Sequence, residues 1–154
     1  AFSDRSLAML GARFTGEPPL AAASGAIRLA VVGAHLSGMP LNPQLVSRRA
    51  RLVRAARTAP RYRLYALEDK PGMVRAPDSG ASIEVEVWEL APRHFGELVA
   101  QIPPPLAIGT VELADGEAVK GFLCEAWAVE GRPEITGYGG WRGYMAAVST
   151  SIER

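Results

Sequence analysis

The chain has 154 residues, of which 17 are Lys or Arg, 16 are Asp or Glu, and 48% are apolar. This length suits one domain with one hydrophobic core. The nearly balanced charge argues against a general binder of nucleic acid or anionic membranes, because such proteins carry a basic excess. No apolar run approaches the ~20 residues that span a bilayer, and the first residues lack the long apolar stretch of a secretory signal. We therefore expect neither a nucleic-acid nor a membrane partner.

The counts of Cys and His limit the chemistry further. Cys124 is the only cysteine, and His35 and His94 are the only histidines. A single cysteine allows no internal disulfide, so we expect a reducing, cytoplasmic setting. One Cys and two His cannot supply the four Cys/His ligands of a structural zinc site. The sequence contains no phosphate-binding P-loop, dinucleotide-binding glycine motif or G-x-S-x-G elbow, so we predict neither a metal nor a cofactor.

Residues 1–26 have the composition of a tail and linker rather than of a core. Leu7, Leu10 and Phe14 recur at helical spacing and predict a short helix that ends near Gly16. A Pro- and Ala-rich stretch follows it. One short amphipathic helix followed by a linker is typical of the end of a preceding domain.

The first predicted core element is a strand over Ile27–Val32, a nearly continuous apolar run that suits a strand buried on both faces. Asn42 and Pro43 then predict the start of a helix that runs over 43–57. Its buried stripe would contain Leu45, Leu52, Val53 and Ala56. Its opposite face would carry Arg48, Arg51, Arg54 and Arg57. Four arginines on one helix could bind phosphate, but a solvated helix face is the more common explanation.

Between this strand and this helix lies a turn of small residues, Gly33 to Gly38, in which His35 is the only titratable side chain. A chain that leaves a buried strand through such a turn presents backbone N–H groups that suit a small anion or a carboxylate. The imidazole of His35 could polarise or protonate a bound carboxylate substrate near neutral pH. The alternative is a histidine that is hydrogen-bonded for local structure only.

Three strands are predicted next, over 61–67, 73–74 and 82–90, the second after a turn at Lys70-Pro71-Gly72. In the third strand, side chains alternate between the two faces. Glu84 and Glu86 therefore share a face with Trp88 and lie about 7 Å apart at the usual rise. Such a pair could divide acid and base roles. The wet face of a half-exposed sheet is the more common explanation, unless the sheet closes and that face lines a cavity with Trp88 as its wall.

The second half of the chain predicts a helix, a hairpin and a short final helix. Pro92 opens a helix with one apolar stripe, which ends at Pro103-Pro104-Pro105. Asp115-Gly116 joins two strands over 106–113 and 118–124 in a hairpin, and a helix could cover 141–148. This order of elements predicts an α+β fold, a small mixed, mostly antiparallel β-barrel with two flanking helices.

Aromatic residues and an arginine gather among glycines near the C-terminus. They are Tyr138, Trp141, Arg142 and Tyr144. Such residues often form a binding lip or an interface. A tail that docks over the mouth of the barrel explains them equally well.

Two pairs of stretches carry a family resemblance: LAVVGAHLSGMPLN with TAPRYRLYAL, and QIPPPLAIGTVELADGEAVKGFLCE with ITGYGGWRGYMA. Together they resemble the C-terminal domain of allophanate hydrolase. The resemblance divides the chain into a tail from a preceding amidase domain (1–26), the C-terminal domain (27–148) and a short tail (149–154). It implies a γ-glutamylcyclotransferase-like fold whose turn after the first strand binds a carboxylate. Where the cyclotransferases have their catalytic glutamate, this sequence has Gln101.

The resemblance also implies a function in urea degradation. In this family the amidase domain acts first, and the C-terminal domain is expected to decarboxylate the product, N-carboxycarbamate. His35 would be the catalytic acid, the amidase domain of the same enzyme a partner, and a homodimer the expected assembly. The candidate substrate-binding residues are Gly33, Ala34, Leu36, Ser37, Gly38, Tyr62, Glu84, Glu86, Trp141 and Arg142.

Two alternative functions remain open at this stage. The first is a non-catalytic interaction or dimerisation module, suggested by the aromatic residues near the C-terminus and by the arginine face of the first predicted helix. The second is a small-molecule cyclotransferase-like enzyme that uses Glu84 or Glu86 as its base.

Overall fold

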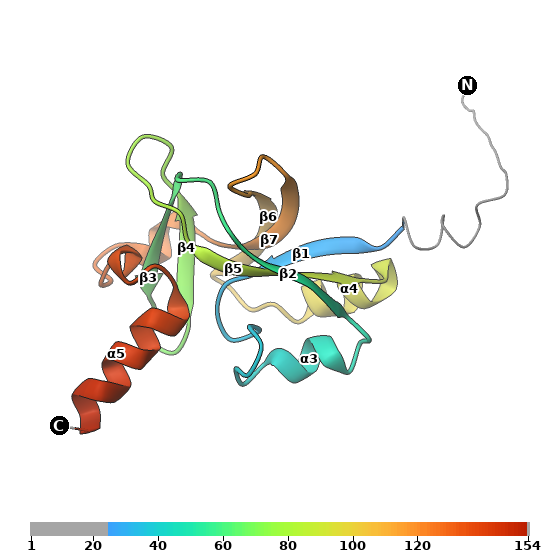
Figure 1. Ribbon diagram of the computed structural model, residues 1–154, viewed down its shortest axis with the longest axis horizontal. Coiled ribbons are helices and arrows are strands. Elements are labelled where there is room, and N and C mark those ends of the chain that lie inside the picture. Colours follow the sequence, from blue (N-terminus) through green and yellow to red (C-terminus); the bar gives the residue numbers. More distant parts are fainter. Residues whose placement is uncertain (1–24, 154) are drawn as a thin grey trace, which may run out of the picture.

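The computed structural model describes residues 25–153 of the chain (Figure 1). The helix and linker predicted within 1–24 lie outside the described residues. The strands are β1 (Ile27–Val31), β2 (Arg51–Arg57), β3 (Tyr62–Ala66), β4 (Pro71–Arg75), β5 (Glu84–Leu90), β6 (Leu106–Glu112) and β7 (Ala118–Cys124). The helices are α3 (Asn42–Val46), α4 (Pro92–Ala100) and α5 (Trp141–Glu153), with 3₁₀ turns η1 (Ala126–Val129) and η2 (Thr136–Tyr138).

Five strands form one sheet in the order β2-β5-β1-β7-β6, and β3 pairs with β4 in a separate hairpin. Only the β1–β7 pair is parallel among these strands. The predicted α+β class with a mostly antiparallel sheet is therefore confirmed. The sheet is not a closed barrel, because its edge strands β2 and β6 do not pair along their length and are joined only just beyond their ends, at the isolated bridge between Thr58 and Leu113.

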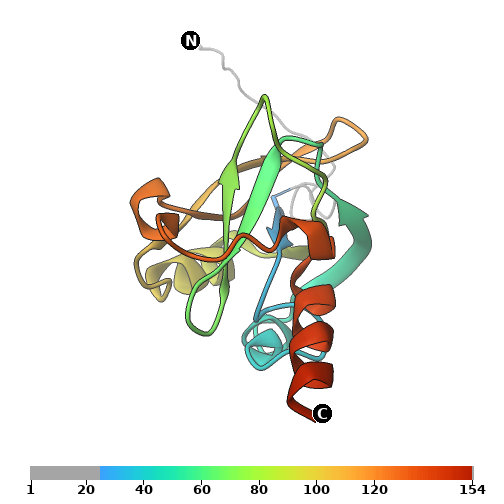
Figure 2. The ribbon, with the colours of Figure 1, turned by 90° about the vertical axis from the view of Figure 1, so that its left-hand side faces the viewer.

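The core lies where the sheet, the β3–β4 hairpin and α4 meet. In Figure 1 the hairpin crosses one end of the sheet, and α3 and α4 lie along one side of it. Tyr62, Leu64, Val85 and Leu98 from these elements are fully or almost fully buried. Helix α5 extends beyond the body of the domain in both ribbon views (Figure 2).

The predicted helix over 43–57 is wrong beyond its first turn. Helix α3 ends at Val46, and the chain reverses at Arg49, which has a left-handed φ of 60°. Residues 51–57 then pair with β5 as an edge strand. A register shift between Leu52 and Arg54 interrupts the alternation that would have predicted a strand.

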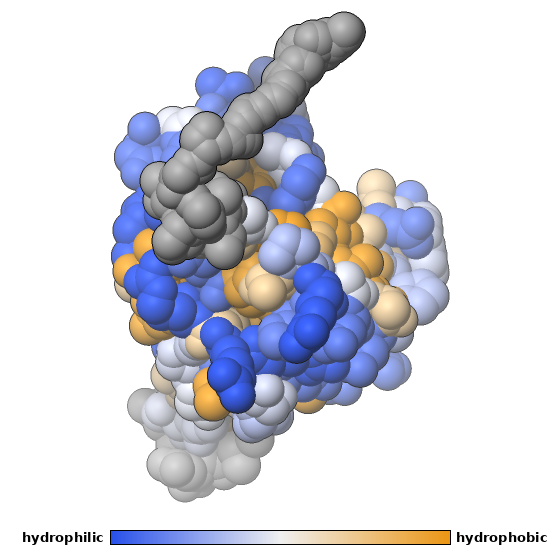
Figure 3. Space-filling model, turned by 90° about the vertical axis from the view of Figure 1, so that its right-hand side faces the viewer, coloured by the Kyte–Doolittle hydropathy of each residue, from blue (hydrophilic) through white to orange (hydrophobic). Residues whose placement is uncertain are grey.

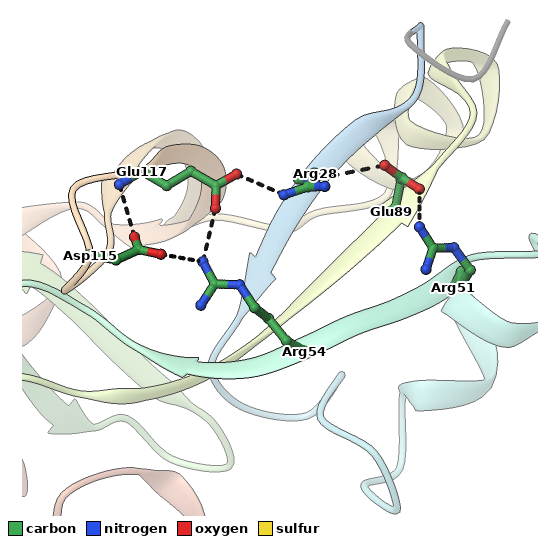
Figure 4. Close-up of polar contacts among 6 residues, drawn as sticks. All are labelled: Arg28, Arg51, Arg54, Glu89, Asp115 and Glu117. Atoms are coloured by element: carbon green, nitrogen blue, oxygen red, sulfur yellow. Dashed lines mark hydrogen bonds and ion pairs between the residues drawn. The ribbon is translucent and has the colours of Figure 1, made fainter. Parts of the chain in front are cut away.

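Two of the arginines assigned to that helix lie in an ion-pair network on the sheet (Figure 4). Arg51 contacts Glu89 at 2.6 Å, and Arg54 contacts Asp115 and Glu117, each at 2.9 Å. Arg28 joins the two groups, because it contacts both Glu89 and Glu117. The charges of Arg51 and Arg54 are thus matched by carboxylates, which removes the reason to expect phosphate there.

Most other predicted elements are confirmed with small changes in length. The hairpin at Asp115-Gly116 is present, and Gly116 has the positive φ of 95° that favours glycine. Pro71 and Gly72 begin β4 rather than forming a turn. Helix α5 continues to Glu153, past the predicted end at 148. None of the helices within residues 25–153 is both long enough and apolar enough to cross a membrane.

The described surface carries some exposed apolar side chains. Figure 3 shows hydrophobic surface flanked by hydrophilic residues on the side of the molecule to which α4 projects. Leu41, Val46, Leu52 and Val99 are large hydrophobic residues, each at least 36% exposed, in or next to α3, β2 and α4.

Candidate functional site

A pocket of about 410 Å³ opens beside the loop that follows β1. Its walls come from this loop, the start of α3, the end of α4, the turn before β4, and the β6–β7 hairpin. The residues that line it are Val32, Gly33, Ala34, His35, Pro40, Leu41, Gln44, Asp69, Lys70, Pro71, Met73, Leu98, Gln101, Ile102, Pro103, Leu106, Phe122 and Leu123. The walls are mainly apolar, and the few polar groups come from different parts of the chain.

The loop after β1 is folded tightly by its own backbone. The N–H of Leu36 donates to the carbonyl of Gly33 at 3.0 Å, and the N–H of Leu41 donates to the carbonyl of Ala34 at 2.8 Å. A Cβ on Gly33 would lie 2.5 Å from the ring of Pro71, so only glycine fits between this loop and β4. The pocket therefore begins where β1 ends.

His35 is half-buried in the wall of this pocket. Its ring stacks on Phe122, with a centroid distance of 5.0 Å and an angle of 19°. Its Nε2 lies 2.9 Å from Oε1 of Gln44, and its carbonyl accepts a hydrogen bond from Asn42. Its Nδ1 has no hydrogen-bond partner within residues 25–153, and this atom is not completely buried. One ring nitrogen is thus held and the other is accessible.

Burial lowers the pKa of His35 below its ordinary value. The hydrogen bond to Gln44 acts in the opposite direction, and the charge of Arg48 lowers the pKa further. The ring is therefore neutral at pH 7. With Oε1 of Gln44 as the acceptor, the proton of the neutral ring sits on Nε2, and Nδ1 carries a lone pair.

Only some of the backbone N–H groups that were expected to hold a substrate carboxylate are free to do so among the described residues. The N–H of Ser37 donates to Oε1 of Glu86 at 2.8 Å. Ala34 and His35 line the pocket, and their N–H groups have no acceptor among the described residues. At most these two donors of the turn are therefore left for an anion.

Glu86 collects hydrogen bonds from three side chains as well. Oε1 accepts from the hydroxyl of Ser37 at 3.0 Å and from the indole N–H of Trp88 at 3.1 Å, and Oε2 accepts from Arg142 at 3.2 Å. Burial alone would raise the pKa of Glu86, but the donors Ser37 and Trp88 and the charge of Arg142 outweigh it and lower the pKa. The face of β5 that was expected to be wet is covered here, because Glu86 is 7% exposed.

The structure brings only part of the predicted site together. Of the predicted residues, His35, Gly33 and Ala34 line the pocket. Ser37, Glu86 and Arg142 form the separate cluster just described. The remaining ones lie outside the pocket: Leu36, Gly38, Tyr62, Glu84 and Trp141.

Two of these outlying residues are buried for structural reasons. Tyr62 belongs to the core, where its hydroxyl accepts a hydrogen bond from the N–H of Glu112 at 2.9 Å. Trp141 is 5% exposed and packs against Tyr144. The expectation that Trp141 forms an exposed lip is therefore wrong.

Sequence reasoning missed the pocket residues Gln44, Lys70 and Phe122. Gln44 follows the predicted helix start, but nothing local in the sequence aims it at His35. Phe122 reads as an ordinary core residue of a strand. Lys70 was assigned to a turn, although its charge beside an apolar stretch was a usable signal. Within residues 25–153, no group of three or more His, Cys, Asp or Glu is placed to hold a metal ion.

Comparison with known proteins gives consistent matches. The family described as the allophanate hydrolase C-terminal domain matches residues 27–146. The urea amidolyase of Saccharomyces cerevisiae is 43% identical over 130 residues, which cover 79% of this chain and 7% of that protein. The chain thus spans a small part of the curated relatives that it matches.

Solved structures agree with these matches. An allophanate hydrolase structure from Kluyveromyces lactis has a TM-score of 0.77 at 40% identity, over 80% of this chain and 21% of that one. A protein specific to uropathogenic E. coli has a TM-score of 0.75 at 40% identity, over 79% of this chain and 96% of that one. An aig2-like protein from Mus musculus shares the fold, with a TM-score of 0.57 at 17% identity over 72% of this chain and 86% of that one. The predicted γ-glutamylcyclotransferase-like fold is confirmed.

Proposed function

The chain belongs to the family of allophanate hydrolase C-terminal domains, and we propose that it binds N-carboxycarbamate in the pocket beside His35 and removes carbon dioxide from it. One observation carries this proposal. A half-buried histidine whose Nδ1 has no hydrogen-bond partner among the described residues lines a mainly apolar pocket of about 410 Å³, which is large enough for a small dicarboxylate.

The reaction needs one proton. N-carboxycarbamate carries a carboxylate on each side of an N–H group. When the C–N bond to one carboxylate breaks, its electron pair stays on nitrogen, and a proton added there gives carbamate and carbon dioxide. A group that delivers this proton as the charge develops lowers the barrier.

His35 is placed to deliver that proton. In the free protein its ring is neutral, because burial lowers its pKa. A bound dianion raises the pKa of a neighbouring imidazole, since the opposite charge favours the protonated form. The ring would take up a proton at Nδ1 when substrate binds and pass it to the substrate nitrogen, while Gln44 holds Nε2.

Each carboxylate of the substrate meets a different environment in the pocket. The N–H groups of Ala34 and His35 and the cation of Lys70 suit the carboxylate that is retained. Phe122, Leu98 and their apolar neighbours suit the carboxylate that leaves, because carbon dioxide is uncharged and apolar walls favour the loss of charge.

The substrate would come from another domain. The chain spans 21% of the K. lactis allophanate hydrolase, so most of that protein lies outside the part that this chain matches. An amidase domain that cleaves allophanate would supply N-carboxycarbamate, and the two steps together would serve urea degradation.

The test is the release of carbon dioxide from N-carboxycarbamate generated by a separate amidase domain acting on allophanate. The wild-type chain should accelerate release above the uncatalysed rate, and His35→Ala should remove the acceleration. His94→Ala is the matched control, because His94 lies on α4 outside the lining of the pocket. Equal rates for wild type and His35→Ala would contradict the proposal.

The alternatives find less support. The cyclotransferase hypothesis used Glu84 or Glu86 as the base, but both lie outside the lining of the pocket, where Asp69 is the carboxylate among the described residues. The interaction module was suggested by the aromatic residues near the C-terminus and by an arginine face. Trp141 is buried and Arg51 is paired with Glu89 on a strand, while Tyr138 is 51% exposed. A homodimer stays a prediction.

A further inference from the structure

We infer that Glu86 and Arg142 form a clamp that positions the His35 loop and that neither residue contacts the substrate. The inference rests on the proposed function of the pocket. From the sequence, both residues were expected to bind substrate. The structure instead makes both of them positioning residues.

The clamp holds Ser37 by both of its backbone polar groups. Its N–H donates to Oε1 of Glu86, and its carbonyl accepts from Nη2 of Arg142. The same nitrogen of Arg142 reaches Oε2 of Glu86, so the carboxylate and the guanidinium fix each other as well as the loop. A carboxylate with two acceptor oxygens and a guanidinium with several donors suit this arrangement.

Burial and further hydrogen bonds also restrict the movement of the loop. Leu36, between His35 and Ser37, is fully buried. On its other side, His35 is held by Gln44 and Asn42 from the start of α3. The loop is thus held at His35 by α3 and at Ser37 by the clamp.

The clamp joins distant parts of the chain. Ser37 follows β1, Glu86 lies on β5 next to it, and Arg142 is in the first turn of α5. Helix α5 is therefore attached to the loop that carries His35. Trp88 completes the enclosure, because its indole N–H donates to Glu86 from the same face of β5.

The clamp has charged neighbours that differ from those of His35. Arg142 is the cation that contacts Glu86. Around His35 the charged groups are Arg48 next to α3 and Asp69 and Lys70 in the pocket wall. A substitution of Glu86 would therefore affect the ring of His35 by changing the position of the loop.

The test compares Glu86→Gln with Glu89→Gln in the whole chain. Glu89 lies on the same strand and pairs with Arg51 and Arg28 in the network on the sheet, away from the loop. In Glu86→Gln, one carboxylate oxygen becomes an amide NH₂ group, which cannot accept the hydrogen bonds that this oxygen accepted. The loop should therefore become more mobile. We expect kcat for carbon dioxide release to fall about tenfold with little change in KM. We also expect the pKa of His35, followed by NMR, to rise toward its ordinary value as the ring becomes more exposed. Glu89→Gln should match the wild type in both.

Two further variants keep the inference testable if Glu86→Gln does not fold. Arg142→Lys keeps a cation that Arg142→Met lacks. We expect Arg142→Lys to restore part of the kcat that Arg142→Met loses.

Three results would overturn the clamp: a Glu86→Gln variant that behaves like Glu89→Gln, an increase in KM with an unchanged His35 titration, or no difference between the two Arg142 variants. The titration of His35 in Glu86→Gln needs no substrate. If His35→Ala keeps full activity, the proposed function fails, but this titration still decides on the clamp.

Discussion

The backbone N–H of Ser37 donates to the carboxylate of Glu86 at 2.8 Å, so a side chain of the protein occupies a donor that a substrate carboxylate could have used. Ala34 and His35, in the same loop, line the pocket, and their N–H groups have no acceptor among the described residues. The N–H of Ser37 therefore fixes the loop, and those of Ala34 and His35 are left for a ligand.

Glu86→Gln should lower the free energy of unfolding by about 2–3 kcal/mol, since hydrogen bonds to a charged group are among the stronger ones. The side chain is almost fully buried and accepts four hydrogen bonds. Urea unfolding of both proteins at pH 7 measures the difference. Glu89→Gln, in a more exposed ion pair, should change the free energy much less. Equal losses of unfolding free energy in the two variants would show that Glu86 contributes no more to stability than Glu89 does.

The contribution of Glu86 should also depend on pH. Its pKa is lowered in the folded protein, so its stabilising effect is fully present above the unfolded value of about 4.5 and is lost as the pH falls through the folded value. The difference in unfolding free energy between wild type and Glu86→Gln should be constant from pH 6 to 8 and should shrink below about 4.5. The comparison is made in a His35→Ala background, because Glu86→Gln is also expected to change the pKa of His35. A difference that persists unchanged at pH 3 would contradict the lowered pKa.

Gly33→Ala should displace the loop from β4. The new Cβ would lie 2.5 Å from the rigid ring of Pro71, so one of the two segments must shift, at a cost of about 1–3 kcal/mol. Thermal or urea unfolding measures the cost. Gly137→Ala is the control, because a Cβ there meets no atom within 4 Å. If Gly33→Ala is as stable as Gly137→Ala, the contact with Pro71 does not constrain the loop.

Gln44→Leu should slow carbon dioxide release while the fold is kept. Gln44 accepts from Nε2 of His35, which leaves the lone pair on Nδ1. Without this acceptor both tautomers form, and we expect kcat to fall about tenfold. Nitrogen chemical shifts of the ring report the tautomer directly. A ring that stays protonated at Nε2 in the variant would rule out this role for Gln44.

Elements with a clear local pattern were predictable from the sequence. The alternation in β5, the hairpin turn at Asp115-Gly116 and the apolar stripe of α4 each depend on neighbours in the sequence. Strand β2 was not predictable in this way, because its bulge breaks the alternation and its Leu, Arg and Ala residues favour a helix. Pairing with β5 overrides that preference.

The candidate site was also predictable from the sequence only in part. His35 and its loop could be found because strand, turn and titratable side chain are consecutive. The partners of the loop could not, because Gln44, Phe122 and Arg142 meet it only through the tertiary fold. The sequence placed Glu86 and Trp88 on one face of β5 correctly. It could not show that the loop and α5 cover that face.

The most direct measurement is the titration of the His35 ring by NMR with and without malonate, which has a CH₂ group where N-carboxycarbamate has its N–H. The chain has only two histidines, so His94→Ala assigns the signals. We predict that the pKa of His35 lies below its ordinary value of 6.5 in the free protein and rises when malonate binds. A His35 signal that titrates identically with and without saturating malonate would contradict an anion site beside this ring.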